Sequence, residues 1–285
     1  MKKLIAIDLD GTLLSSHIEI SQENIKALQE AQEAGHIVMI CSGRAPEDIK
    51  IVLEKTPLEC PIAGSNGTMV IADGKLLSQV SIQKEIVQSV AKILNEQKFP
   101  FKIYTNKGIF VAKTWSERML VFLEENPDIA KGLTEKEYKF MTEQPKETDT
   151  IKHFEKVEDI LSNTEITIQK FFVPTLSGKN ELITHLKDVK GISVTTSGPY
   201  NIEIMDVNGH KGNGVKVMAE YFNIPIEDTV AIGDNFNDVP MLEVAGLSVA
   251  MGNADPTVKE MADVVTLTNN EHGVAHAIRE YILKK

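Results

Sequence analysis

Two acidic motifs, far apart in the chain, hold the residue types that could do chemistry. Asp8-Leu9-Asp10-Gly11-Thr12 directly follows the apolar run 4–7, and Gly233-Asp234-Asn235-Phe236-Asn237-Asp238 directly follows the apolar run 229–232. In open α/β sheets, ligands bind outside the carboxyl ends of the strands. Carboxylates crowded there repel one another unless a cation or a shared proton lies between them. We therefore expect a site for Mg²⁺, which prefers oxygen ligands and retains several waters.

Each motif also has an ordinary structural interpretation, which the residues alone leave open. Asp10-Gly11 is typical of a turn. Asp234 or Asn237 could cap the helix that carries Met241 and Leu242. If residues 234–238 are helical, Asp234 and Asp238 lie on one face of that helix, because they are four residues apart.

Two further segments offer groups that could bind an anion. Ser42 and Gly43 follow the apolar run 37–40, and they would present a hydroxyl and backbone N–H groups at the start of a helix. Lys211 precedes an amphipathic helix, and by itself it is interpreted as an ordinary solvated lysine. Cys41 invites a thiol-phosphatase interpretation, but too few residues separate it from Arg44 for a loop around phosphate. We interpret Cys41 as a buried strand residue.

The elements that must position these motifs follow the alternation of strand and helix typical of a parallel sheet. Ser21 is a plausible N-cap and Gly35 a stop signal for the first helix. Further helices are expected at 239–245, around 258–262 and at 273–283. Strands are expected at 4–7, 37–40, 61–63, 229–232, 247–250 and 264–267. The fold class is therefore α/β, with a parallel-sheet, Rossmann-like core.

The middle of the chain has a different pattern. It carries long amphipathic helices and scattered strands at 102–104, 170–173 and 201–204, with polar stretches between them. We interpret residues 83–206 as an inserted α+β domain. The outer domain would then be discontinuous, formed by 1–82 and 207–285.

Composition excludes several classes of protein. The 285 residues are 42% hydrophobic, enough for a sizeable core, and the net charge is −11. An acidic chain without a Lys/Arg-dense stretch is a poor nucleic-acid or membrane-surface binder. Two cysteines exclude a disulfide framework and favour a reducing compartment, and no apolar stretch is long enough to span a bilayer. We expect a cytoplasmic protein, and the oligomeric state stays open between monomer and dimer.

Taken together, the four segments resemble the haloacid-dehalogenase-like phosphohydrolases. The first acidic motif matches the D-x-D-G-T nucleophile motif, and Ser42 and Lys211 match the second and third motifs. Gly233-Asp234 through Asn237-Asp238 matches the fourth. The insert between the second and third motifs, together with Ser65-Asn66-Gly67 and 250–254, is similar to the Cof-type subfamily with a C2-type cap. The resemblance implies that 83–206 is a cap that sets substrate specificity.

The resemblance also implies roles for the residues. Asp8 would attack the phosphorus of a phosphate monoester and form an aspartyl-phosphate, and Asp10 would act first as acid and then as base. Mg²⁺ would be held by the Asp8 carboxylate, the Asp10 backbone carbonyl and Asp234, while Asp238 would orient a metal-bound water or Lys211. The phosphoryl oxygens would be bound by the N–H groups of Leu9 and Gly43 and by the side chains of Ser42, Lys211 and Asn237. From position alone, Arg44 and Asn66 are expected to contact the substrate.

The predicted function is hydrolysis of small soluble phosphate monoesters with Mg²⁺ as cofactor. Sugar phosphates are the commonest implication of the resemblance, followed by phosphorylated cofactors and flavin-pathway intermediates. Two alternatives remain. One is a phosphomutase that uses the same aspartyl-phosphate, and the other is a non-catalytic regulator that binds a phosphorylated metabolite.

Overall fold

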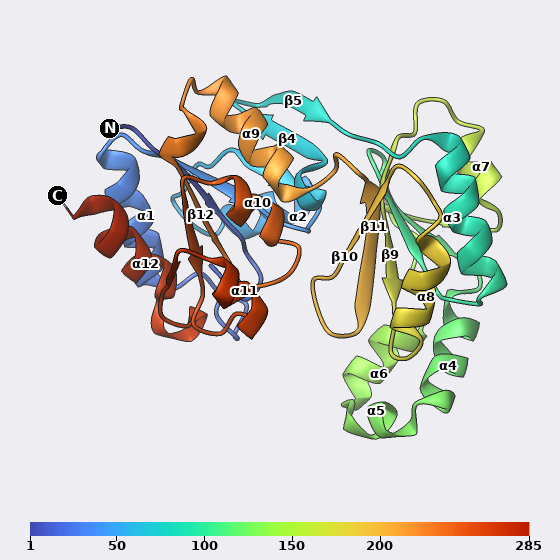
Figure 1. Ribbon diagram of the computed structural model, residues 1–285. Coiled ribbons are helices and arrows are strands. Elements are labelled where there is room, and N and C mark those ends of the chain that lie inside the picture. The colour runs from blue at the N-terminus through green and yellow to red at the C-terminus, as the bar shows by residue number, and fades with distance from the viewer. Residues whose placement is uncertain (285) are drawn as a thin grey trace. The chain divides into compact units, whose positions relative to one another are not determined.

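The chain divides into two compact units, each with its own sheet. The structure is a computed structural model that describes residues 1–284. The first unit comprises Met1–Val80 and Asn208–Lys285, and the second comprises Ser81–Val207. Both ends of the chain therefore build the first unit, drawn in blue to cyan and in orange to red in Figure 1. We expected an inserted domain at 83–206, and the second unit of the structure comprises Ser81–Val207.

The first unit contains an eight-stranded sheet in the order β14-β13-β12-β1-β2-β3-β4-β5. The pairs from β14 to β3 are parallel, as predicted, and β4 and β5 extend the sheet with antiparallel pairs. The strands are β1 (Leu4–Ile7), β2 (Ile37–Cys41), β3 (Ile62–Gly64), β4 (Met69–Ala72), β5 (Lys75–Gln79), β12 (Thr229–Gly233), β13 (Leu247–Ala250) and β14 (Val264–Val265).

The register of the central strands brings the sequence motifs to one edge of the sheet. Ile7 pairs with Ile232 of β12 on one side and with Ile40 of β2 on the other. Parallel strands end at the same edge, so the segments that follow these three residues emerge side by side. Every residue of β1 is buried, as is typical of a strand covered on both faces.

Helices cover both faces of this sheet. α1 packs against α12, and α9 packs against α10 on the opposite face (Figure 1). α1 begins as predicted, because the Ser21 side chain accepts a hydrogen bond of 3.2 Å from the Asn24 N–H. The helices are α1 (Gln22–Glu33), α2 (Pro46–Leu53), α9 (Lys211–Tyr221), α10 (Val239–Val244), α11 (Pro256–Met261) and α12 (Gly273–Ala277).

Besides shifts of one or two residues in several bounds, three details of the first unit differ from the sequence-based expectations. The β4–β5 hairpin was not predicted, although its turn residues Asp73 and Gly74 both have positive φ, the conformation that makes Asp-Gly a hairpin signal. The strand expected at 264–267 is limited to Val264–Val265. The helix expected at 273–283 consists of α12 followed by a π-helix, Ile278–Leu283.

The second unit is an α+β domain. Its sheet has the order β10-β11-β9-β6-β7-β8 and is antiparallel except for the β7–β8 pair. The predicted strands 102–104, 170–173 and 201–204 lie within β6, β9 and β11. The strands are β6 (Lys102–Thr105), β7 (Gly108–Ala112), β8 (Ile151–Phe154), β9 (Ile168–Pro174), β10 (Ile192–Thr195) and β11 (Asn201–Asp206). The helices are α3 (Lys84–Glu96), α4 (Trp115–Glu125), α5 (Pro127–Gly132), α6 (Glu135–Thr142), α7 (Val157–Leu161) and α8 (Lys179–Leu186).

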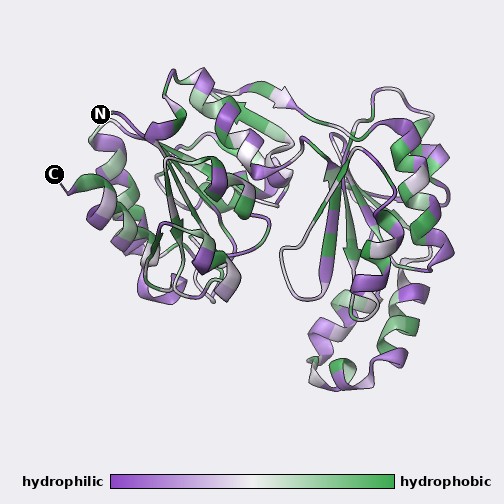
Figure 2. Cartoon of the chain, viewed as in Figure 1, coloured by the Kyte–Doolittle hydropathy of each residue, from purple (hydrophilic) through white to green (hydrophobic). Residues whose placement is uncertain are grey.

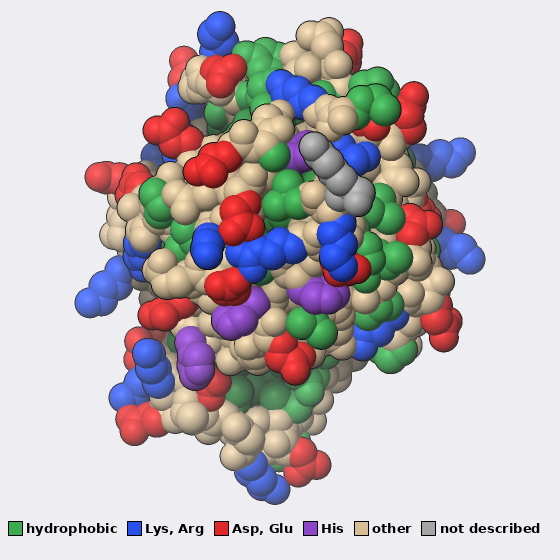
Figure 3. Space-filling view, turned by 90° about the vertical axis from the view of Figure 1, so that its left-hand side faces the viewer, with side chains coloured by type: hydrophobic (Ala, Val, Ile, Leu, Met, Phe, Trp, Pro, Cys, Tyr) green, Lys and Arg blue, Asp and Glu red, His purple; other side chains and the backbone are tan. Residues whose placement is uncertain are grey.

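Each unit buries its own apolar core. Figure 2 shows hydrophobic residues along the strands of both sheets and on one side of most helices. On the face drawn in Figure 3, acidic, basic and apolar side chains are interspersed. Within residues 1–284, no helix combines the length and the apolar character needed to cross a membrane.

Gly246 lies in the turn from α10 to β13, where the backbone of the first unit is closely packed. A Cβ at this position would overlap the backbone carbonyl of Glu227, whereas a Cβ at Gly132 would meet no atom within 4 Å. Gly246→Ala must therefore displace backbone, and we expect it to lower the free energy of unfolding by about 1–3 kcal/mol. Gly132→Ala should change it little. Thermal unfolding followed by circular dichroism compares the two, and equal stability would contradict this account of the turn.

Candidate active site

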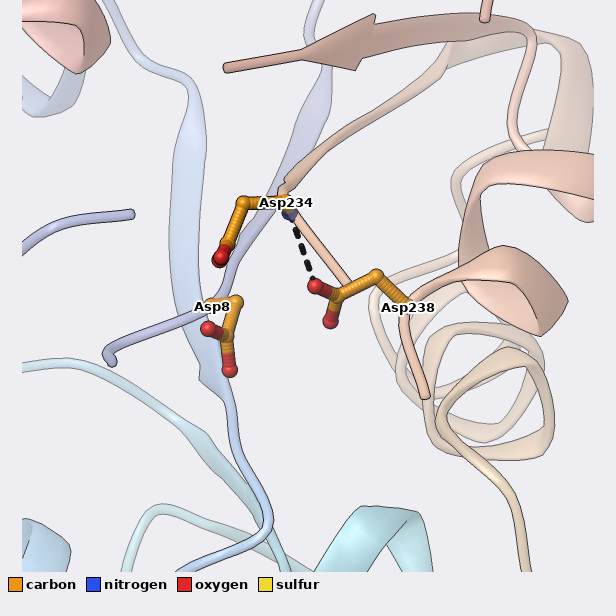
Figure 4. A group of neighbouring side chains, drawn as sticks. All are labelled: Asp8, Asp234 and Asp238. Carbon is orange, nitrogen blue, oxygen red and sulfur yellow. Dashed lines mark hydrogen bonds between the residues drawn. The ribbon is translucent and has the colours of Figure 1, made fainter. Parts of the chain in front are cut away.

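Three aspartates from two segments of the chain converge at the carboxyl edge of the first unit's sheet. Asp8 follows β1, and Asp234 and Asp238 follow β12. One carboxylate oxygen from each lies within 4.8 Å of the others. Figure 4 shows the three side chains gathered in this way, with the Asp234 N–H donating to Asp238 Oδ2 at 2.9 Å.

Lys211 is the cation of this cluster. Its side chain is 0% exposed, and its Nζ donates to Asp8 Oδ1 and to Asp238 Oδ1, each at 2.5 Å. The interpretation of Lys211 as a solvated surface lysine is therefore wrong. It failed because the pattern of the nearest helix does not reveal that Lys211, the first residue of α9, contacts the segments that follow β1 and β12.

The charges of the cluster do not balance. When all four groups are ionised, three carboxylates and one ammonium leave a net charge of −2. Burial raises the pKa of Asp8 well above its ordinary value, with Asp238 and Asp234 adding to the effect and Lys211 opposing it. Burial also raises the pKa of Asp234 to about 7, assisted by the nearby charge of Asp238. A bound divalent cation would offset this excess of negative charge.

The turn after β12 is held by Asp238. Its Oδ2 accepts the N–H groups of Asp234 at 2.9 Å and Asn235 at 3.0 Å, and its Oδ1 binds Lys211. Residues 234–238 form a turn rather than a helix. The alternative in which Asp234 or Asn237 caps α10 is wrong as well, because Asp238 occupies the N-cap position without a side-chain cap bond.

Gly11 and Thr12 are the last two residues of the first motif. No separate role was predicted for either of them from the sequence. Gly11 has φ +83°, and a Cβ there would overlap the Asp234 carboxylate. Thr12 Oγ1 donates to Asp234 Oδ1 at 2.7 Å. The D-x-D-G-T pattern contained both residues, but only the fold shows that this loop approaches the segment after β12.

Ser42 and Gly43 lie at the end of β2, next to the loop that follows β1. Ser42 is buried, and its Oγ accepts the Arg44 N–H at 3.2 Å. Its backbone carbonyl accepts the Asn66 N–H at 2.9 Å. The hydroxyl expected to bind phosphate is therefore held at the sheet edge from which Asp8 also emerges.

Asn66 contacts Asn237, the amide expected to bind phosphate. Asn237 Nδ2 donates to Asn66 Oδ1 at 3.2 Å, and both side chains are buried. Ser65, Asn66 and Gly67 all have positive φ, a strained backbone for the first two, and such strain is concentrated at functional sites. The structure thus places Asn66 in direct contact with Asn237, another predicted site residue.

Asp10 stands apart from the three clustered aspartates. Its side chain is 57% exposed and is bound by Arg44, whose Nε and Nη2 donate to its two oxygens at 2.8 and 2.6 Å. Leu9, between the two aspartates, is fully buried. Asp8 and Asp10 are thus separated into a buried and an exposed environment.

Cys41 is not a nucleophile in this arrangement. It lies buried in β2, and its Sγ donates to the Lys211 carbonyl at 3.7 Å. Burial raises the pKa of the thiol to about 12, so the reactive thiolate is disfavoured.

Comparison with known proteins places this geometry in a family. The model of the haloacid dehalogenase-like hydrolase family matches residues 5–278. Phosphatase YwpJ of Bacillus subtilis (strain 168) is 31% identical, with 98% of this chain and 100% of the relative covered. The 5-amino-6-(5-phospho-D-ribitylamino)uracil phosphatase YwtE of the same organism is 34% identical, with 98% of each chain covered.

Solved structures agree. A haloacid dehalogenase-like hydrolase from B. subtilis superimposes with a TM-score of 0.82 at 31% identity, covering 98% of this chain and 100% of that one. The α/β fold and the resemblance inferred from the four motifs are thereby confirmed. The chain belongs to the haloacid dehalogenase-like hydrolases and is a phosphatase of the Cof type.

Proposed function

We propose that the protein hydrolyses small phosphate monoesters through an aspartyl-phosphate on Asp8, with Mg²⁺ as cofactor. The observation that carries this proposal is the buried cluster in which Lys211 contacts Asp8 and Asp238 while Asp234 lies beside them. A nucleophilic carboxylate, an ammonium and a surplus of acidic oxygens together suit a phosphate ester and a divalent cation.

The donor set fits Mg²⁺. It consists of hard oxygen atoms, and the net charge of −2 of the fully ionised cluster suits a divalent ion. Asp8, Asp234 and the backbone carbonyl of Asp10 would hold the ion, because both Asp238 oxygens already accept hydrogen bonds. When bound, Mg²⁺ would shield the negative charge of the phosphate from the attacking carboxylate.

In the first half of the reaction, an oxygen of Asp8 attacks the phosphorus and the bond to the leaving oxygen breaks. Asp10, in its protonated form, gives its proton to that oxygen, and the alcohol departs. Lys211, Ser42 and Asn237, with the N–H groups of Leu9 and Gly43, would hold the phosphoryl oxygens.

In the second half, Asp10 is a carboxylate and takes a proton from water. The water oxygen attacks the phosphorus, the bond to Asp8 breaks, and inorganic phosphate leaves. Both residues return to their starting forms, so the cycle is balanced without another reactant.

The relatives and the insert support a proposal for the substrate class. YwtE is named for a phosphorylated ribityl compound, which is a small phosphate monoester. We propose the same class for this chain, with sugar phosphates and phosphorylated cofactors or flavin intermediates as candidates. Residues 83–206 would serve as the cap that selects the leaving group.

Substituting Asp8→Asn should reduce turnover by about a thousandfold or more, because the amide cannot form the phosphoenzyme. Asp128→Asn is the matched control, since the Asp128 side chain is 98% exposed. Phosphate release is measured for both, with circular dichroism to confirm folding. A folded Asp8→Asn variant that retains activity would contradict the assignment of the nucleophile.

Removing the metal should abolish activity, and Mg²⁺ should restore it. In Asp234→Asn, we expect the Mg²⁺ concentration for half-maximal activity to rise at least about tenfold, because a charged ligand is lost. Mg²⁺ should also raise the melting temperature of the wild-type protein, and this variant should need a correspondingly higher Mg²⁺ concentration for the same rise. Full activity in EDTA would exclude the metal-dependent mechanism.

A panel of sugar, nucleotide, pyridoxal and flavin phosphates, each with Mg²⁺ and with EDTA, tests the substrate class. Strong Mg²⁺-dependent release of phosphate from one compound is the expected result. Weak release from many would indicate a loosely selective insert. If the folded protein released phosphate from none, a mutase or a regulator would become the better hypothesis.

A further inference from the structure

Arg44 forms a bidentate ion pair with Asp10, the residue proposed as acid and base. Arg44 Nε donates to Asp10 Oδ2 at 2.8 Å, and Nη2 donates to Oδ1 at 2.6 Å. Two parallel N–H···O bonds fix the direction of a carboxylate as well as its position. Arg44 was predicted from its position to contact the substrate, and in the structure its guanidinium binds Asp10.

The Asp10 side chain depends on this contact for its orientation. Its side chain is 57% exposed, and within residues 1–284 the only hydrogen bonds to its carboxylate come from Arg44. An exposed carboxylate without such a partner would populate several rotamers. The paired donors of Arg44 select one of them.

Arg44 is itself firmly attached to the end of β2. Its backbone N–H donates to Ser42 Oγ at 3.2 Å, and its carbonyl accepts the Ser65 N–H at 2.7 Å. Its side chain is only 29% exposed. β1 and β2 are neighbouring parallel strands, so the ion pair ties the loop after β1 to the end of β2.

We propose that Arg44 is a positioning residue that orients the Asp10 side chain for its work as acid toward the leaving oxygen and as base toward the attacking water. This inference rests on the proposed function, because it concerns the work of Asp10 in that reaction. A misplacement of about 1 Å lowers a rate by about a hundredfold. A lysine would supply the charge but not the two-pronged geometry.

The experiment compares two esters that differ in their need for an acid. An alkyl phosphate needs a proton on its leaving oxygen, whereas p-nitrophenyl phosphate releases a stable phenolate. Wild type, Arg44→Gln, Arg44→Lys and the reference variant Asp10→Asn are assayed on both esters. Lys55→Gln is the matched control, because Lys55 lines the same cavity of about 460 Å³ as Arg44. Circular dichroism melting establishes that each variant folds.

If Arg44 acts through Asp10, Arg44→Gln should lower kcat/KM for the alkyl ester by about 10–100-fold. The initial burst of p-nitrophenol should stay within about threefold of the wild-type rate, since that step needs no acid. Asp10→Asn should show the same selectivity more strongly, Arg44→Lys should recover part of the loss, and Lys55→Gln should match wild type.

Three results would overturn the inference alone. A burst slowed as much as alkyl turnover would mean that Arg44 binds the phosphoryl group. A higher KM with unchanged kcat in Arg44→Gln would indicate that Arg44 contacts the substrate. Wild-type rates in Arg44→Gln would show that the ion pair does not contribute to the reaction. If wild type itself releases phosphate from neither ester, the proposed function fails, and the inference fails with it.

Discussion

The site depends on a single buried ammonium that contacts two of three clustered carboxylates. Lys211 is fully buried, which requires charged partners, and Asp8 and Asp238 supply them. The same contacts leave negative charge in excess, because Asp234 lies within the cluster without an ammonium of its own. The interaction that allows Lys211 to be buried therefore also makes the site attractive to a divalent cation.

The site separates two carboxylates that are only two residues apart. Asp8 is buried against Lys211, whereas Asp10 is largely exposed and bound by Arg44. Different environments allow chemically identical groups to take different roles in one reaction. Leu9, which lies between them in the chain, is fully buried. This separation supports the assignment of one aspartate as nucleophile and the other as acid and base.

A second set of contacts connects the loops around this cluster. Asn66 accepts a hydrogen bond from Asn237, and its own N–H donates to the Ser42 carbonyl. The left-handed backbone at Ser65 and Asn66 is unfavourable by itself, so it persists because such contacts hold it in place. The groups proposed to bind phosphate therefore come from segments that stabilise one another.

The residue pattern was enough to predict the α/β class and the strands that carry the motifs. It also determined which residues gather at the edge of the sheet, because parallel strands rich in buried apolar residues place their carboxyl ends together. It could not determine that Lys211 is buried, that Arg44 binds Asp10, or that Asn66 binds Asn237. Lys211 and Asp8 are 203 residues apart in the sequence, Arg44 and Asp10 are 34 apart, and Asn66 and Asn237 are 171 apart. These contacts are visible only in the folded chain, because a side-chain contact depends on the packing of distant segments and on rotamers that no local pattern encodes.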